Sequence, residues 1–159
     1  MSTSPPDGPA HPSQVGPPTT APVGALVVGF DGSAPSARAV SWAISVAQGT
    51  GATLSLVYAH QPNSRLAEPL TEEEATSPLR AVERSLELLL RTARDAGVRV
   101  EALTREGAPA DIILRLAGER RAAGIVVGTR GLGGAEKVIL GSVSSQVVAR
   151  ALVPVTVVP

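Results

Sequence analysis

Short apolar runs alternate with stretches of helical periodicity from residue 24 to residue 159. The runs are continuous or alternating in apolar character and have the length of strands, several of them buried on both faces. They cover residues 24–30, 52–59, 98–104, 124–128 and 153–158. Between them, apolar residues recur every three or four positions, as they do in helices that bury one face. The pattern predicts five strands that alternate with four helices.

Residues at the ends of the helical segments predict where the helices begin and end. The first helix follows the turn sequence "DGSAPS", carries Val40 and Ile44 on its apolar stripe, and has Gly49 at its predicted C-terminal cap. The second ends at Gly97. The second, third and fourth helices are predicted to begin at residues that suit a helix N-terminus. These are Ser77–Pro78, Pro109 and Ser142.

The alternation predicts an α/β protein built from right-handed βαβ units. We expect a three-layer αβα arrangement around a five-stranded, mainly parallel sheet. The third strand, residues 98–104, carries more polar residues and is expected near a sheet edge. Sheets of this kind bind ligands beyond the carboxyl ends of their strands, where the strand order reverses. The loops to inspect are therefore "FDGS" after the first strand and "GTRGLGG" after the fourth.

The composition of the chain excludes some classes of protein. The chain has 159 residues, 14 basic and 14 acidic side chains and no cysteine. The balanced charge argues against a non-specific nucleic-acid or membrane-surface binder, and the lack of cysteine excludes a disulfide framework. Residues 1–22 are rich in Pro, Ser and Thr and predict a disordered tail before one domain at 23–159. No signal peptide or membrane span is recognisable, so we expect a cytoplasmic protein.

The stretch "GTRGLGGAEKVILGSVSSQVV", residues 128–148, is the strongest candidate for chemistry. Gly128 and Gly131 follow a strand, and after nine further residues Gly141–Ser142 opens a helix. Glycine lets backbone amides approach a phosphate, and a helix N-terminus adds unpaired N–H groups and partial positive charge. The alternative is that the glycines only permit turns and that Ser142 only caps its helix. Walker and dinucleotide fingerprints are absent.

The spacing Gly128-x₂-Gly131-x₉-Gly141-Ser142 resembles the nucleotide signature of the universal stress protein family, in its ATP-binding subgroup. "VGFDGSAPSARAVSWA" resembles that family's first strand and helix, and "LGSVSSQVVARALVPVTVVP" its last helix and strand. The resemblance covers residues 24–159. It implies a Rossmann-like fold of the adenine nucleotide alpha hydrolase-like type, with ATP as the ligand.

The resemblance also implies roles for individual residues. Asp31 would contact the adenosine beside Phe30, and the backbone of Ala59 would meet the adenine. The sugar and phosphates would lie against the remaining implied positions, which are Val127, Gly128, Arg130, Gly131, Gly141, Ser142, Val143 and Ser144. The alternative for Asp31 is a turn or capping role. The hydroxyls of Ser142 and Ser144 would act as donors.

One part of the loop departs from the family pattern. Many relatives carry an aromatic residue and a further glycine where this chain has Ala135, Glu136 and Lys137. A carboxylate near phosphates would weaken affinity unless it points outward or helps to hold a divalent ion. Magnesium would suit the negative charge of the phosphates, but the sequence does not indicate which residues would bind it.

The resemblance implies a homodimer that pairs the last strand, residues 153–158, with Pro154 restricting the register. The expected function is an ATP-binding regulatory protein of the stress response, with no nucleic-acid or membrane partner and no catalytic residue assigned. A slow ATPase or phosphoryl-transfer enzyme at the same site is one alternative. A dimeric interaction module without nucleotide is another. The spacing of Ser142, His60 and Asp31 does not favour a catalytic triad.

Overall fold

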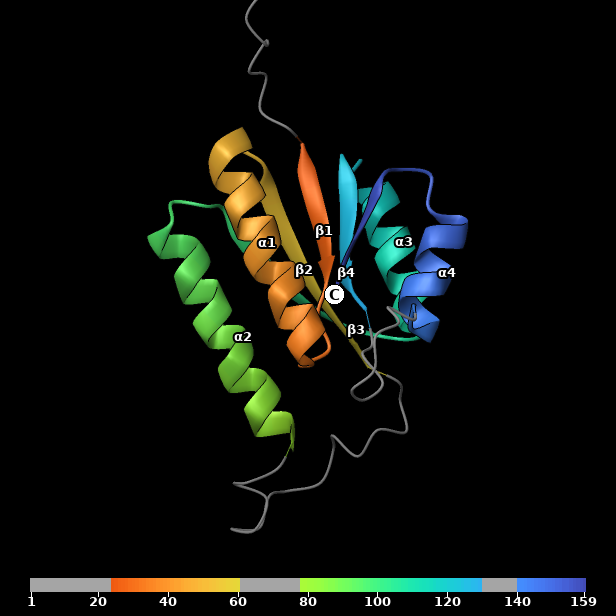
Figure 1. The fold of residues 1–159 in the computed structure, drawn as a ribbon, viewed down its shortest axis with the longest axis horizontal. Helices are drawn as coiled ribbons and strands as arrows, with labels where there is room; N and C mark the ends of the chain where they lie inside the picture. Colours follow the sequence, from red (N-terminus) through yellow and green to blue (C-terminus); the bar gives the residue numbers. More distant parts are fainter. Residues whose placement is uncertain (1–23, 61–77, 130–139) are drawn as a thin grey trace, which may run out of the picture.

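A computed structural model describes residues 24–60, 78–129 and 140–159 of the chain. The predicted tail, the connection at 61–77 and the loop at 130–139 lie outside the described residues. Five parallel strands form one sheet in the order β3-β2-β1-β4-β5, with helices on both faces (Figure 1). The elements are β1 (Ala25–Gly29), α1 (Ala34–Thr50), β2 (Thr53–His60), α2 (Pro78–Asp95), β3 (Val100–Glu106), α3 (Pro109–Glu119), β4 (Gly124–Gly128), α4 (Ser142–Arg150) and β5 (Val155–Val158).

Both faces of the sheet are buried, which explains the continuous apolar runs of the central strands. Leu26 and Val28 of β1 pack under α1 and α2 in one cluster. Val27, between them in sequence, packs under α3 and α4 in the other. Successive side chains of a strand point to opposite faces, so a strand covered on both sides needs apolar residues at every position. The predicted three-layer α/β fold is confirmed, and the sheet is parallel throughout.

Several predicted boundaries differ from the structure by one or two residues. α1 continues through Gly49 to Thr50, and Gly51 caps it in the left-handed conformation with φ 71°. β3 begins at Val100, because the Val98 amide still donates to the Ala93 carbonyl at the end of α2 (2.9 Å). β5 begins at Val155, so Pro154 precedes this strand, and its carbonyl accepts from the Ile125 amide (2.9 Å).

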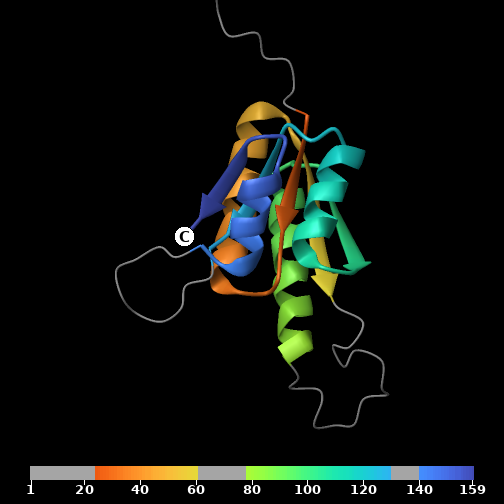
Figure 2. The same cartoon turned by 90° about the vertical axis from the view of Figure 1, so that its right-hand side faces the viewer.

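The strand order places the two loops singled out from the sequence next to each other. β1 pairs with β2 on one side and with β4 on the other, so the connection direction reverses between β1 and β4. β3 lies at one edge, as predicted, and β5 at the other. All four helices follow a strand and begin at the carboxyl ends of the strands (Figures 1 and 2). This end of the molecule therefore combines a reversal point with the helix N-termini.

Candidate functional site

A pocket of about 270 Å³ opens at the carboxyl ends of the central strands. Three strand ends line it, at residues 29–31, 57–59 and 127–129. The first turns of three helices complete it, through Ser33 and Ser36 of the α1 start, Pro109 and Ile113 of α3, and Gly141, Val143 and Ser144 of the α4 start. The pocket therefore lies where open parallel sheets hold their ligands.

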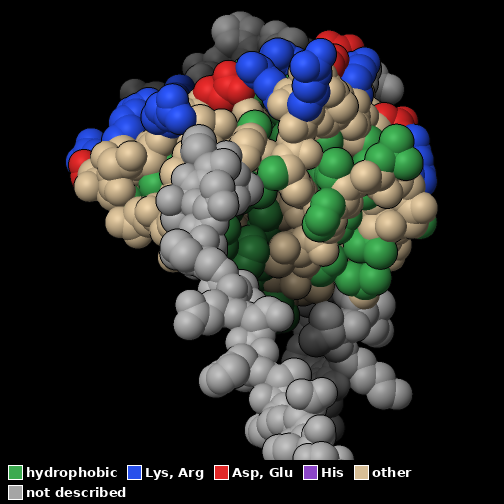
Figure 3. Space-filling view, turned by 90° about the horizontal axis from the view of Figure 1, so that it is seen from above, with side chains coloured by type: hydrophobic (Ala, Val, Ile, Leu, Met, Phe, Trp, Pro, Cys, Tyr) green, Lys and Arg blue, Asp and Glu red, His purple; other side chains and the backbone are tan. Residues whose placement is uncertain are grey.

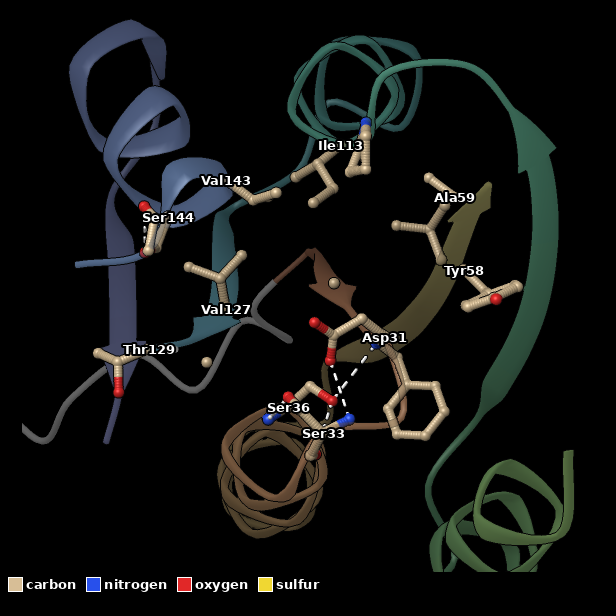
Figure 4. A pocket seen from close by; sticks show the side chains of 16 residues that line it. Asp31, Ser33, Ser36, Tyr58, Ala59, Ile113, Val127, Thr129, Val143 and Ser144 are labelled. Atoms are coloured by element: carbon tan, nitrogen blue, oxygen red, sulfur yellow. Dashed lines mark hydrogen bonds between the residues drawn. The ribbon is translucent and has the colours of Figure 1, made fainter. Parts of the chain in front are cut away.

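The pocket has one polar and one apolar wall (Figure 4). Asp31, Ser33 and Ser36 lie on the side of α1. Ile113 and Val143 lie on the opposite side, at the starts of α3 and α4. A ligand that fills the space needs hydrogen-bonding groups towards the first wall and an apolar surface towards the second. Small-molecule sites commonly combine these two features.

Hydrogen bonds within the turn after β1 fix the position of Asp31. Its Oδ1 accepts from the Ser33 amide (2.9 Å), which is an Asx-type turn. The Ser36 hydroxyl donates to the Ser33 carbonyl (2.9 Å) and accepts from the Asp31 amide (3.3 Å). The Ser33 hydroxyl caps α1 by accepting from the Ser36 amide (3.3 Å). The turn role that was the alternative for Asp31 is therefore present, and the same residue also lines the pocket.

The starts of α3 and α4 lack such caps. Their N-cap residues are Ala108 and Gly141, and neither makes a side-chain cap hydrogen bond. The first amides of a helix have no partner within it, and they carry its partial positive charge. Gly141 lines the pocket. The beginning of α4 can therefore offer amides to an anion in the pocket.

The two serines predicted at this helix start are placed differently. Ser144 is 2% exposed, and its hydroxyl donates to the Gly141 carbonyl (3.1 Å). Ser142 is exposed and does not line the pocket. The start of α4 therefore lines the pocket through Gly141, Val143 and Ser144, and the hydroxyl of Ser144 is held by the Gly141 carbonyl.

Gly128 has a packing role besides its place in the pocket lining. A Cβ on this residue would lie 2.5 Å from the carbonyl carbon of Pro35 and 2.6 Å from the amide nitrogen of Ser36. Backbone atoms cannot move aside as a flexible side chain can. Glycine at this position lets the first turn of α1 approach the end of β4, which closes one side of the pocket.

Most of the predicted site residues come together. Those that line the pocket are Phe30, Asp31, Ala59, Val127, Gly128, Gly141, Val143 and Ser144. Arg130 and Gly131 lie outside the described residues, as do Ala135, Glu136 and Lys137. The side chain of His60 is also outside them.

Sequence reasoning missed other lining residues. Ser33 and Ser36 stand in the turn "DGSAPS", whose capping pattern was visible. Tyr58 and Thr129 lie at strand ends, so the predicted strand boundaries could have indicated that they line the pocket. Ile113 carried no signal, because its place on the apolar stripe of α3 marks it only as a core residue.

Residues 24–60, 78–129 and 140–159 contain no group of three or more His, Cys, Asp or Glu side chains that would hold a metal ion. Within them, no helix is both long enough and apolar enough to cross a bilayer.

Comparison with known proteins gives one consistent family. The sequence model of the universal stress protein family matches residues 23–159. A universal stress protein of Thermus aquaticus is 39% identical over 135 residues, which cover 84% of this chain and 96% of the relative. One from Mycobacterium tuberculosis is 37% identical over 141 residues, covering 84% and 94%.

Solved structures agree. A universal stress protein crystallised in complex with cAMP superposes with a TM-score of 0.64 at 32% identity, covering 87% of this chain and 98% of that one. A universal stress family protein of Arabidopsis thaliana with AMP bound gives a TM-score of 0.62 at 22% identity, covering 84% and 90%. The second likeness shows the fold alone.

Proposed function

Because the chain belongs to the universal stress protein family, we propose that it is an adenine-nucleotide-binding regulatory protein that uses the pocket between β1 and β4. The observation that carries the proposal is the two-walled pocket at the reversal point of the sheet. The structural relative that is 32% identical was solved with cAMP. An adenine nucleotide has a base with a flat aromatic face, a polar sugar and an anionic phosphate. The apolar wall suits the face of the base, the polar wall suits the sugar, and the start of α4 suits the phosphate.

The ligand's orientation follows from the two walls. The base lies at the end of β2, where the Ala59 backbone and the Ile113 side chain line the pocket. The ribose hydroxyls donate to the Asp31 carboxylate, which the turn after β1 holds in place. The phosphate lies at the start of α4, where Gly141 lines the pocket and, as the N-cap residue, has no side chain to cap the first amides. The helix end stabilises the anion there.

ATP is the nucleotide to which the glycine signature points. Phosphates beyond the first would extend towards Arg130 and Gly131, in the part of the loop that the structure does not describe. Arginine at this place would supply charge-assisted hydrogen bonds to them. Magnesium would bind through the phosphate oxygens and water, as it commonly does with nucleotides.

A second element of the proposal is a homodimer through β5. This strand is the sheet edge beside β4, and its residues Val155–Val158 are half-buried. Two exposed apolar side chains lie beside it in sequence, Val148 in α4 (46% exposed) and Leu152 before the strand (101%). A short apolar edge favours pairing with another strand. Antiparallel pairing of two copies would bury the edge and these side chains together.

Binding without rapid turnover is the favoured activity. Among the described residues, Asp31 is the carboxylate that lines the pocket, and it lies across the pocket from α4 (Figure 4). A hydrolase needs a group that orients water at the terminal phosphate. Slow ATP hydrolysis at the same site is the alternative.

Calorimetry with AMP, cAMP and ATP tests the proposal. Asp31→Asn retains an oxygen for the Ser33 amide and removes the charge, so we expect about tenfold weaker binding with an unchanged unfolding midpoint. Asp95→Asn, on the exposed side of α2, is the matched control and should bind as the parent does. Absence of heat with all three nucleotides at millimolar concentration would refute the binding function. Phosphate release from ATP above buffer, lost in Asp31→Asn, would favour the enzyme.

A further inference from the structure

Arginine side chains gather at the end of the molecule opposite the pocket, where the strands begin. Figure 3 looks onto this end and shows basic side chains along one side of it, with acidic ones between them. The residues are Arg91 and Arg94 near the end of α2, Arg99 before β3, and Arg120 and Arg121 after α3. All five are exposed. They are called the arginine surface below.

Most of the positive charge on this surface is not compensated by ion pairs. Arg120 pairs with Glu101 of β3 (2.9 Å), and Glu101 also accepts from the buried Ser55 hydroxyl (2.6 Å). Across residues 24–60, 78–129 and 140–159, the other four arginines form no salt bridge with a described carboxylate. The chain as a whole has no net charge. Five of its 14 basic residues lie on the arginine surface.

Backbone strain marks one of these residues. α1 and α2 are each followed by a glycine in the left-handed conformation, Gly51 at φ 71° and Gly97 at φ 72°. After α3 the corresponding left-handed residue is Arg121, at φ 46°. The bond from the Ala122 amide to the Ala117 carbonyl (2.9 Å) closes this helix end. A side chain makes this conformation costly, and glycine avoids the cost.

The helix dipole does not account for Arg121. A cation near the C-terminus of a helix is favourable, but Arg120 already supplies one with right-handed backbone angles (φ −87°, ψ −3°). The second arginine adds strain where glycine would relieve it. Strained residues with exposed charge are candidates for a role in recognition.

From the charge and the strain together, we infer that the arginine surface binds an acidic polypeptide segment of a partner protein. Guanidinium groups form paired hydrogen bonds with carboxylates. Asp95 and Glu101 stand among the arginines, so the positive charge lies in separate groups and does not form the continuous basic stripe that a nucleic-acid backbone follows. Within the described chain, Phe30 and Tyr58 line the pocket at the other end and Trp42 lies halfway along α1, so no aromatic platform serves nucleic-acid bases here.

The test is fluorescence anisotropy of the full chain with a fluorescein-labelled decaglutamate peptide at low ionic strength. We expect saturable binding that weakens as salt is added, because exposed charges are screened. Saturating AMP should leave the affinity unchanged, since the pocket is at the opposite end. Arg99→Ala should weaken binding by about threefold, the range for one exposed ion pair. Arg84→Ala, nearer the start of α2, is the matched control and should leave binding unchanged.

Arg121→Gly gives the decisive result. It should weaken peptide binding by about threefold while raising the unfolding midpoint by about 2 °C, because the strain is relieved. Absence of peptide binding, equal losses in Arg84→Ala and Arg99→Ala, or a lower midpoint for Arg121→Gly would each overturn the inference. Tighter binding of a ten-nucleotide oligothymidylate than of the peptide would replace it with nucleic-acid recognition.

Discussion

The starts of α1 and α4 both border the pocket, but they satisfy their backbone amides in different ways. At α1, Ser33 caps the helix and Ser36 and Asp31 complete a local network of hydrogen bonds. At α4, the N-cap is Gly141, which has no side chain to offer. The start of α1 is therefore capped by its own side chains without a ligand. The start of α4 leaves backbone amides that a ligand can bind.

This difference separates two tasks within one pocket. The network at α1 holds the polar wall in place before any ligand arrives, so Asp31 loses little freedom on binding. The uncapped amides at α4 give up the stabilisation that a serine or aspartate cap would supply. They retain the ability to bind an anion. Three substitutions test this division.

The largest effect is expected from Gly128→Ala, which attacks the close contact between β4 and α1. The new Cβ would lie within 2.8 Å of three backbone atoms of Pro35 and Ser36. We expect a loss of about 3 kcal/mol in the free energy of unfolding, since overpacking against backbone is not easily relieved. Urea denaturation measures it. Gly118→Ala is the control, because a Cβ there meets nothing within 4 Å. Equal stability of Gly128→Ala and the parent protein would mean that α1 is free to move.

A smaller effect is expected from Ser33→Ala, which removes the cap of α1. The Ser36 amide would lose its acceptor, and the free energy of unfolding should fall by about 1 kcal/mol. Nucleotide affinity should fall as well, because the turn that carries Asp31 loosens. Calorimetry and urea denaturation of the same variant measure both. Ser45→Ala, an exposed serine on the outer side of α1, should leave both quantities close to those of the parent protein. Unchanged affinity in a destabilised Ser33→Ala would show that the polar wall needs no preorganisation.

The smallest change in stability is expected from Gly141→Ser, which gives α4 the cap that it lacks. The backbone angles of Gly141 (φ −68°, ψ 169°) are accessible to serine. We expect a gain of a few tenths of a kcal/mol in stability. Nucleotide binding should weaken, since the new hydroxyl competes for an amide that the phosphate uses. Tighter binding would instead mean that the phosphate does not use the α4 amides.

Much of the fold follows from the sequence because its determinants are local. Pro109 and Ser142 mark the observed starts of α3 and α4, and residues 124–128 form β4 as predicted. The incorrect predictions concern element boundaries at which two nearby residues could each end a helix or begin a strand. Gly49 and Gly51 both suit a helix end, and only the bond from the Gly51 amide to the Ala47 carbonyl decides between them. Pro154 could begin a strand on sequence grounds, but the pairing of β5 starts after it.

The candidate site was predictable where it coincides with strand ends and with the glycine signature. The glycine signature pointed to Gly128 and Gly141, the end of the first strand pointed to the loop "FDGS", and the family resemblance singled out Asp31 within it; all three residues line the pocket. Ile113 was not, because an apolar residue on a buried helix stripe looks the same whether it faces the core or a ligand. The packing role of Gly128 was also hidden, since its partner at Pro35 is more than ninety positions away in sequence.

The sequence by itself determined the alternation of strands and helices, the αβα class and the two loops that meet at the pocket. These follow from periodicity and from residues whose conformational preferences act over a few positions. Only the tertiary structure decided which helix start is capped from within, which glycine is needed for packing, and where an arginine occupies a position better suited to glycine. Those properties depend on atoms brought together from distant parts of the chain and on backbone angles that the packing imposes.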